Sequence, residues 1–196
     1  MAGTVSALVS SRRGHFRMES GYHSAWWYEL ESLFDHPVQL RPFVSELAAR
    51  LSSHRPEAVC GPESGGAKLA GMIASELGVA CLVAERFETR ASEMFPVAYR
   101  IPAIQRRSAS ERSVAIVDDA ISAGSAVRGA HAGLVACGAR PVAIGALIVF
   151  GDAAARFAAD AGLALEGIER LPLELWLPGD CPMCAAGVAL ETIGAG

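Results

Sequence analysis

Two adjacent carboxylates, Asp118 and Asp119, follow an apolar run at residues 114–117. Five small residues come shortly afterwards, where a helical pattern begins: Ser122, Ala123, Gly124, Ser125 and Ala126. The pattern predicts a buried strand that carries two negative charges to its carboxyl end, where a loop opens a helix. The unpaired N–H groups and positive end of such a helix suit a phosphate monoester. The acidic pair can accept hydrogen bonds from the two neighbouring hydroxyls of a ribose, so a ribose 5-phosphate fits both halves.

An ordinary strand, turn and helix, in which the acids only cap the turn, is the alternative. The order of residues 118–126 resembles the 5-phosphoribosyl-1-pyrophosphate (PRPP) motif of type I phosphoribosyltransferases, in the form found in orotate phosphoribosyltransferases. The resemblance implies transfer of the phosphoribosyl group to a nitrogenous base, with release of pyrophosphate and with Mg²⁺ held mainly by PRPP. Asp118 and Asp119 would hold the ribose and stabilise positive charge at its C1 atom, while residues 122–126 bind the 5-phosphate. A non-catalytic protein that senses PRPP or a nucleotide is the rival on the same fold.

A second glycine-containing loop follows the predicted short strand at residues 58–60, and its residues Glu63, Ser64, Gly65 and Gly66 precede a helix. By resemblance this loop binds pyrophosphate, with a cis peptide bond between Glu63 and Ser64; a simple glycine turn is the alternative. Residues 85–112 lose regular patterning, which is typical of a lid. By resemblance the lid closes over PRPP from the partner of a homodimer, with Arg86 at its first basic position and Arg90 at a later one. Ser92 stands at the expected histidine position, and Phe87 at a second basic position.

The segment from Ser20 to Trp27 resembles the base-binding segment of orotate phosphoribosyltransferases, where a lysine precedes Ser-Gly; this chain has Glu19 there. After the apolar strand that ends at Phe150, the family has Asp-Arg, whereas this chain has Gly151 and Asp152. Two cationic positions have become anionic, which disfavours an anionic orotate. The predicted base-binding residues are Tyr22, Trp26, Trp27 and Asp152.

The chain has 196 residues, 52% of them hydrophobic, and a formal charge of −4. Its size predicts a single domain, and its charge argues against a general binder of nucleic acid or membrane surfaces. The five histidines show no metal-ligand spacing, and the lone pair Cys181 and Cys184 is half of a zinc site at most, so we expect incidental or structural thiols. Cysteine usage predicts a reducing cytoplasm.

Strand and helix signals alternate from about residue 41 to residue 150. The alternation predicts an α/β fold with a doubly wound, mainly parallel sheet flanked by helices, as in type I phosphoribosyltransferases. Ligands of such sheets bind beyond the carboxyl ends of the strands, so both loops and Arg86 should share one rim. Residues 1–40 and 151–196 do not continue the alternation and are expected to form a small hood over that rim.

Overall fold

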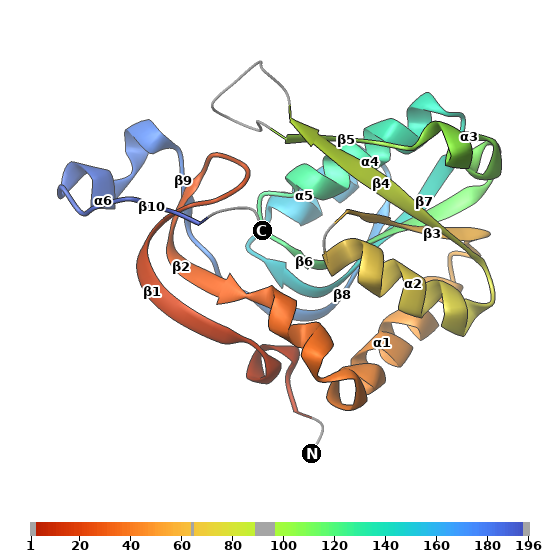
Figure 1. Cartoon of the computed structure of the whole chain (residues 1–196), viewed down its shortest axis with the longest axis horizontal. Coiled ribbons are helices and arrows are strands. Elements are labelled where there is room, and N and C mark those ends of the chain that lie inside the picture. The colour runs from red at the N-terminus through yellow and green to blue at the C-terminus, as the bar shows by residue number, and fades with distance from the viewer. Residues whose placement is uncertain (1–2, 64, 89–96, 194–196) are drawn as a thin grey trace.

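A six-stranded sheet forms the centre of the molecule in the computed structural model, which describes residues 3–63, 65–88 and 97–193 (Figure 1). The strand order is β5-β4-β3-β6-β7-β8. The bounds are β3 (Ala58–Pro62), β4 (Ala80–Glu88), β5 (Val97–Arg100), β6 (Ser113–Ile121), β7 (Arg140–Phe150) and β8 (Ala164–Leu171). All neighbouring strands are parallel except the antiparallel pair β4 and β5. The predicted doubly wound, mainly parallel α/β sheet is confirmed.

Helices cover both faces of this sheet and divide the core into two clusters. The main helices are α1 (Pro37–Ser52), α2 (Gly65–Leu77), α3 (Ala103–Ala109), α4 (Ser125–Ala136) and α5 (Ala153–Asp160). Alternate residues of β6 face opposite clusters, as the strand period of two requires. Val114 and Ile116 pack with the cluster that contains α4 and α5, whereas Ala115 and Val117 pack with the cluster of α1 and α2.

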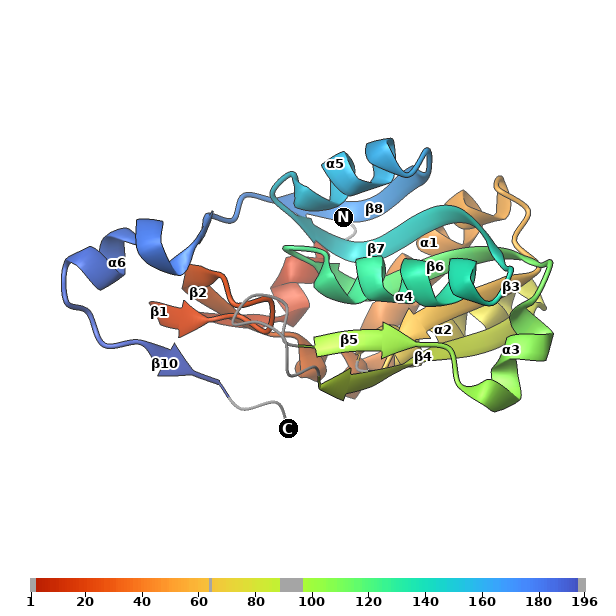
Figure 2. The same ribbon diagram turned by 90° about the horizontal axis from the view of Figure 1, so that it is seen from above.

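A second, smaller sheet lies beyond one end of the main sheet and combines both ends of the chain (Figures 1 and 2). Its strand order is β10-β1-β2-β9, with bounds β1 (Ser10–Arg17), β2 (His23–Glu29), β9 (Leu175–Trp176) and β10 (Glu191–Thr192). The short helical turns η3 (Pro178–Asp180) and α6 (Pro182–Ala185) accompany it, whereas η1 (Val5–Leu8) and η2 (Leu30–Asp35) precede β1 and follow β2 and pack against the α1 side of the main domain. We call this small sheet with its turns the hood, as expected from the sequence.

The structure departs from the sequence expectations in three places. The main sheet continues past residue 150, because α5 and β8 add one more helix and parallel strand to it. The region 85–112 is not an irregular lid throughout: β4 pairs with β5 as a hairpin and α3 follows. The first main helix begins earlier than the alternation from about residue 41 indicated: Pro37 begins α1, and Pro42 lies inside it.

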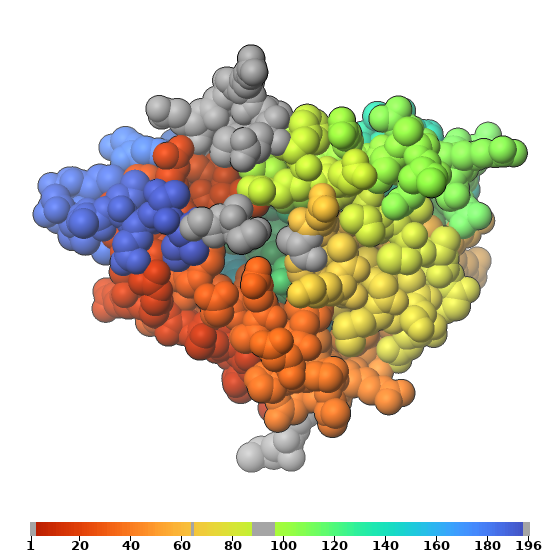
Figure 3. Space-filling view, in the orientation of Figure 1, coloured from red at the N-terminus to blue at the C-terminus, as the bar shows by residue number. Residues whose placement is uncertain are grey.

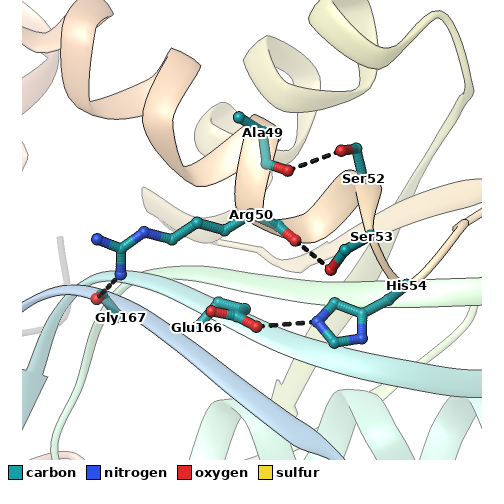
Figure 4. Close-up of polar contacts among 7 residues, drawn as sticks. All are labelled: Ala49, Arg50, Ser52, Ser53, His54, Glu166 and Gly167. Carbon is teal, nitrogen blue, oxygen red and sulfur yellow. Dashed lines mark hydrogen bonds and ion pairs between the residues drawn. The ribbon is translucent and has the colours of Figure 1, made fainter.

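Contacts at the end of α1 fasten that helix to the edge strand β8 (Figure 4). The Arg50 guanidinium donates a hydrogen bond of 2.8 Å to the carbonyl oxygen of Gly167, and His54 lies 2.9 Å from a Glu166 carboxylate oxygen. These contacts hold β8 at the sheet edge, where only one side of the strand has a neighbour. Within the described residues, no helix has the length and apolar character needed to cross a membrane.

Candidate functional site

The acidic pair Asp118 and Asp119 lies near the carboxyl end of β6, beside β3. The chain leaves β3 toward one side of the sheet and leaves β6 toward the other, so this is the point where ligands of doubly wound sheets bind. The two side chains are only 6% and 8% exposed. The end of a strand beside a loop would be expected to leave the pair beside solvent, and the burial of both side chains shows that this expectation is wrong.

The glycine-rich start of α2 buries the pair. A β-carbon at Gly65 would lie 1.8 Å from an Asp119 carboxylate oxygen, and one at Gly66 would lie 2.6 Å from an Asp118 carboxylate oxygen. At Gly61, at the end of β3, a β-carbon would lie 2.0 Å from the carbonyl oxygen of Gly66. The loop can approach the carboxylates this closely only because these three positions carry no side chain.

Burial and mutual repulsion disturb the titration of both acids. Burial raises the pKa of Asp118 well above its ordinary value, and the neighbouring Asp119 raises it further. Burial likewise raises the pKa of Asp119, while its hydrogen bond from the Ala120 N–H and the nearby Lys68 ammonium act in the opposite direction. Two buried carboxyl groups in contact favour a state that holds a proton between them.

The loop after β6 opens α4 as the sequence predicted. Gly124 is the residue before the first helical residue Ser125, and its φ of +79° is the left-handed conformation that favours glycine. On one side of this loop lies a hollow of about 450 Å³, within the size range of ligand sites. Its lining comprises Tyr22, Ala123, Arg128, Ala153, Arg156 and Leu175. Two guanidinium groups and a helix N-terminus therefore border one space that suits an anion.

Arg86 lies on β4, and acidic side chains surround it. Its Nε atom is 3.3 Å from a carboxylate oxygen of Glu19, and its backbone N–H donates to the Glu63 carboxylate at 3.0 Å. Among the residues that the structure describes, the Nε–H has no hydrogen-bond partner of good geometry, so its contact with Glu19 is electrostatic. The Tyr99 hydroxyl donates to the other Glu19 oxygen at 3.0 Å. The glutamate that stands where the resemblance expects lysine is thus held between Arg86 and Tyr99.

A second, smaller hollow lies between the hood and the sheet, next to the same loop. It is lined by Met18, Trp27, Tyr28, Leu30, Ala120, Ser122, Phe150 and Leu173, none of which is charged. The space-filling view shows this face of the molecule indented between the hood, in red and orange, and the yellow residues around α2 (Figure 3). Of the predicted base-binding residues, Trp27 lines the smaller hollow and Tyr22 the larger one. Trp26 is 40% exposed and lines neither, and Asp152 is exposed beside the start of α5.

Some predicted features lie outside the described residues. They are Ser64 with its peptide bond to Glu63, and the lid positions Arg90 and Ser92. The described part of the pyrophosphate loop contributes Glu63, which is exposed, and Gly65 and Gly66, which contact the acidic pair.

The structure corrects the interpretation of the histidines and cysteines. His15 and His23 of the hood meet Cys181 and Cys184, and the four ligand atoms lie within 4.8 Å of one another. Sequence spacing could not reveal this group, because His15 and Cys181 are 166 residues apart. The two histidines therefore complete, within the same chain, the group of which the cysteine pair was expected to be half at most.

Other residues of the site escaped sequence reasoning. Lys68 had a readable signal, because it lies within a few residues of the glycine loop at residues 61–66. Arg128 follows the phosphate loop by one helical turn, which is also readable. Tyr99 had no readable signal in the sequence, because Tyr99 and Glu19 are 80 residues apart and the β4–β5 hairpin brings them together.

No family model matches the chain. The orotate phosphoribosyltransferase of Thermotoga maritima is 30% identical over 182 residues, which cover 93% of this chain and 90% of that protein. The orotate phosphoribosyltransferase of Caldanaerobacter subterraneus is 28% identical over 185 residues, with coverage of 93% and 90%.

Solved structures show the same fold. The adenine phosphoribosyltransferase of Giardia lamblia complexed with 9-deazaadenine matches with a TM-score of 0.65 and 18% identity, over 86% of this chain and 98% of that chain. The orotate phosphoribosyltransferase of Aeropyrum pernix matches with a TM-score of 0.61 and 20% identity, over 84% and 89%. At these identities the structural matches establish the fold alone.

Proposed function

The chain belongs to the type I phosphoribosyltransferases, and from this premise we propose that it transfers the phosphoribosyl group to a neutral nitrogenous base rather than to orotate. Its family consists of PRPP-dependent enzymes related to the orotate and adenine phosphoribosyltransferases. One observation carries the choice of base. Where the resemblance expects a lysine, this chain has Glu19, and the described residues that line the hollow between hood and sheet carry no charged side chain.

We assign the ribose to the acidic pair and the pyrophosphate to the loop that contacts the pair. Gly65 and Gly66 touch the two carboxylates, so a ribose and a pyrophosphate bound there would meet at the C1 atom that joins them in PRPP. When the C1–oxygen bond breaks and the base nitrogen bonds to C1, Asp118 and Asp119 would stabilise the developing positive charge. Glu63 and Ser64 belong to the same pyrophosphate-binding assignment.

The 5-phosphate is assigned to the loop at the start of α4. The proposed contacts are the backbone amides of Ser122, Ala123, Gly124, Ser125 and Ala126, at the positive end of a twelve-residue helix. The hollow that Ala123 shares with Arg128 and Arg156 adds two cations to this place. The phosphate would therefore bind through amides and charge together, without a base-specific contact.

Arg86 is assigned to the departing pyrophosphate. It lies on the same rim as the glycine loop, and Glu63 of that loop accepts its backbone N–H. In this family's reaction we propose that Mg²⁺ is held mainly by the oxygens of PRPP, as Mg²⁺ commonly is where phosphates are handled. Carboxylate oxygens such as those of Asp118 and Asp119 are hard donors that fit this ion. A homodimer, in which a partner closes the site, remains part of the proposal.

The base is assigned to the uncharged hollow and its aromatic rim. Trp27 and Tyr28 supply flat apolar surfaces on which a planar ring can stack, and Tyr22 lies across the phosphate loop. Glu19, which stands where the resemblance expects a lysine, is paired with Arg86, so no cation from that position meets a carboxylate in this hollow. Losing the attraction of one unit charge at about 5 Å, with an effective dielectric near 20, costs a carboxylate-bearing base about 3 kcal/mol, or about a hundredfold in affinity.

The test is a pyrophosphate-release assay with PRPP and Mg²⁺ over neutral purines, pyrimidines and pyridines, with orotate in parallel. We expect the best neutral base to exceed orotate in kcat/KM by about a hundredfold. An orotate value within about tenfold of the best neutral base would overturn the assignment of the base. Calorimetric PRPP binding without pyrophosphate release on any base would instead favour the sensing role.

A further inference from the structure

Two histidines and two cysteines from opposite ends of the chain converge inside the hood. His15 lies on β1, and His23 is the first residue of β2. Cys181 directly precedes the short helix α6, and Cys184 lies within it. Each residue offers one nitrogen or sulfur atom, and all four atoms lie within 4.8 Å of one another. None of these residues belongs to the PRPP site.

Four of the six separations between these atoms are close to those of a tetrahedral metal shell. With ordinary zinc–nitrogen and zinc–sulfur bond lengths, tetrahedral ligands lie about 3.3 Å apart for two nitrogens and about 3.6 Å for nitrogen and sulfur. The nitrogens His15 Nε2 and His23 Nδ1 are 3.2 Å apart. The nitrogen–sulfur distances are 3.3 Å from His15 to Cys181, 3.7 Å from His15 to Cys184 and 3.3 Å from His23 to Cys184.

The surroundings orient the ligands toward one point. The Nδ1 atom of His15 lies 2.9 Å from the carbonyl oxygen of Val188, which can only accept a hydrogen bond. Nδ1 therefore carries the proton, and Nε2 presents its lone pair to the cluster; metal-ligating histidines are commonly held this way. His15, His23 and Cys181 are buried, so the group is no accidental meeting of surface side chains.

The C-terminal segment needs such an anchor, because it has almost no core of its own. From Leu177 to Ile193, Cys181 is the single buried residue of the segment. Strand β10 joins β1 through only two residue pairs, and β9 joins β2 through two. Apolar burial on this scale does not offset the entropy of ordering about seventeen residues, whereas a structural metal ion can supply the missing stabilisation.

We propose that His15, His23, Cys181 and Cys184 bind one Zn²⁺ ion that fastens the C-terminal segment to the β1–β2 hairpin. Four protein ligands leave no open position, so the site is structural rather than catalytic. Two thiolates and two imidazoles in a tetrahedral arrangement select zinc over Mg²⁺ or Ca²⁺, which prefer oxygen ligands. The competing use of a C-x-x-C pair is a redox disulfide, which would leave the two histidines without a role.

The first measurement uses the full-length chain without an affinity tag, purified without chelator. Elemental analysis should find about one zinc per chain. After stripping with a chelator under reducing conditions, added Co²⁺ should produce the visible bands of tetrahedral cobalt and a thiolate charge-transfer band, and Zn²⁺ should displace it. Less than about a tenth of a zinc per chain, together with no cobalt spectrum, would overturn the proposal. So would a Cys181–Cys184 disulfide in protein that was kept reduced.

Variants locate the ion. The double variant Cys181→Ser and Cys184→Ser should lose zinc to below about a tenth per chain, whereas Cys81→Ser, an exposed thiol on β4, should retain it. If the double variant fails to fold, limited proteolysis of the wild-type chain still tests whether the metal ion anchors the C-terminal segment. Stripping should speed cleavage within residues 177–193 by at least about tenfold, and Zn²⁺ should reverse this; equal cleavage rates would refute the anchoring role.

Discussion

The contact between Glu19 and Arg86 holds the arginine assigned to pyrophosphate in a pair with a carboxylate of its own chain. PRPP must compete with Glu19 for this guanidinium. The variant Glu19→Gln removes the charge and keeps an oxygen that can accept the Tyr99 hydrogen bond. We therefore expect Glu19→Gln to bind PRPP more tightly than the wild type does.

The size of the effect follows from the geometry. Two unit charges at 3.3 Å attract by about 1.3 kcal/mol at the dielectric of water and about 5 kcal/mol at an effective dielectric of 20. The side chains of Arg86 and Glu19 are 28% and 39% exposed, which places the pair nearer the first figure. A release of about 1–2 kcal/mol corresponds to PRPP binding about 5- to 30-fold tighter.

Isothermal titration calorimetry with PRPP and Mg²⁺ measures this gain, which should shrink as salt is added. Glu85→Gln is the matched control, because Glu85 neighbours Arg86 on β4 but pairs with Arg100 at 3.6 Å. It removes the same charge without freeing Arg86, so its affinity should change little. An unchanged PRPP affinity in folded Glu19→Gln, or an equal gain in Glu85→Gln, would refute the competition.

Three further predictions concern the loops and the acidic pair. Burial raises the pKa of both acids in the folded state, so their contribution to stability is fully present below the unfolded pKa and is lost as pH rises through the folded pKa. The double variant Asp118→Asn and Asp119→Asn removes both charges. It should therefore raise Tm near pH 7 by about 2–4 °C for each kcal/mol of destabilisation that it removes, and a lower Tm by calorimetry would contradict this. It should also abolish turnover, because the pair is assigned to the ribose. Gly65→Ala should weaken PRPP binding, because its β-carbon would meet Asp119. The control Gly71→Ala, on the open face of α2, should stabilise the fold by about 0.5–1 kcal/mol. Equal PRPP affinities of these two variants by calorimetry would refute the assignment of the loop. A β-carbon at Gly124 would make only ordinary contacts with the described residues, so Gly124→Ala should cost only about 1–2 kcal/mol of backbone strain, measured by chemical denaturation. We expect its PRPP affinity to be at least tenfold lower. An unchanged PRPP affinity would overturn the assignment of the phosphate.

Sequence patterning predicted the features that depend on local order. The strand, loop and helix at residues 113–136 are contiguous, so their residue types specify both the elements and the acidic pair between them. Parallel central strands are apolar almost throughout, which made β6 and β7 easy to identify. The edge strand β8 is only partly buried along its length, so its sequence lacks the apolar run that marks the central strands and indicates no strand after residue 150.

Long-range contacts account for what sequence reasoning missed. The acidic pair is buried by Gly65 and Gly66, which lie more than fifty positions earlier in the chain, so its exposure cannot be read from its own neighbours. The pairing of Glu85 with Arg100 and of Phe87 with Ala98 forms a hairpin from residues whose polarity resembles a loop. The histidine–cysteine group exists only once β1, β2 and the C-terminal segment are assembled.

The hood connects the two proposals through one turn. Glu19 lies between β1 and β2, where the Met18 N–H donates to the Tyr22 carbonyl at 2.8 Å, and His23 follows directly. A metal ion on His15 and His23 would fix both strands at the base of this turn, so Glu19 would meet Arg86 already positioned. Prepositioned partners lose less side-chain entropy than ordinary surface ion pairs do, so the free energy of the Glu19–Arg86 contact should lie at the upper end of the range for exposed pairs. The gain in PRPP affinity from Glu19→Gln should therefore fall after zinc is stripped and Mg²⁺ restored. An equal gain with and without zinc, measured by the same calorimetry, would show that the turn holds Glu19 in place without the metal.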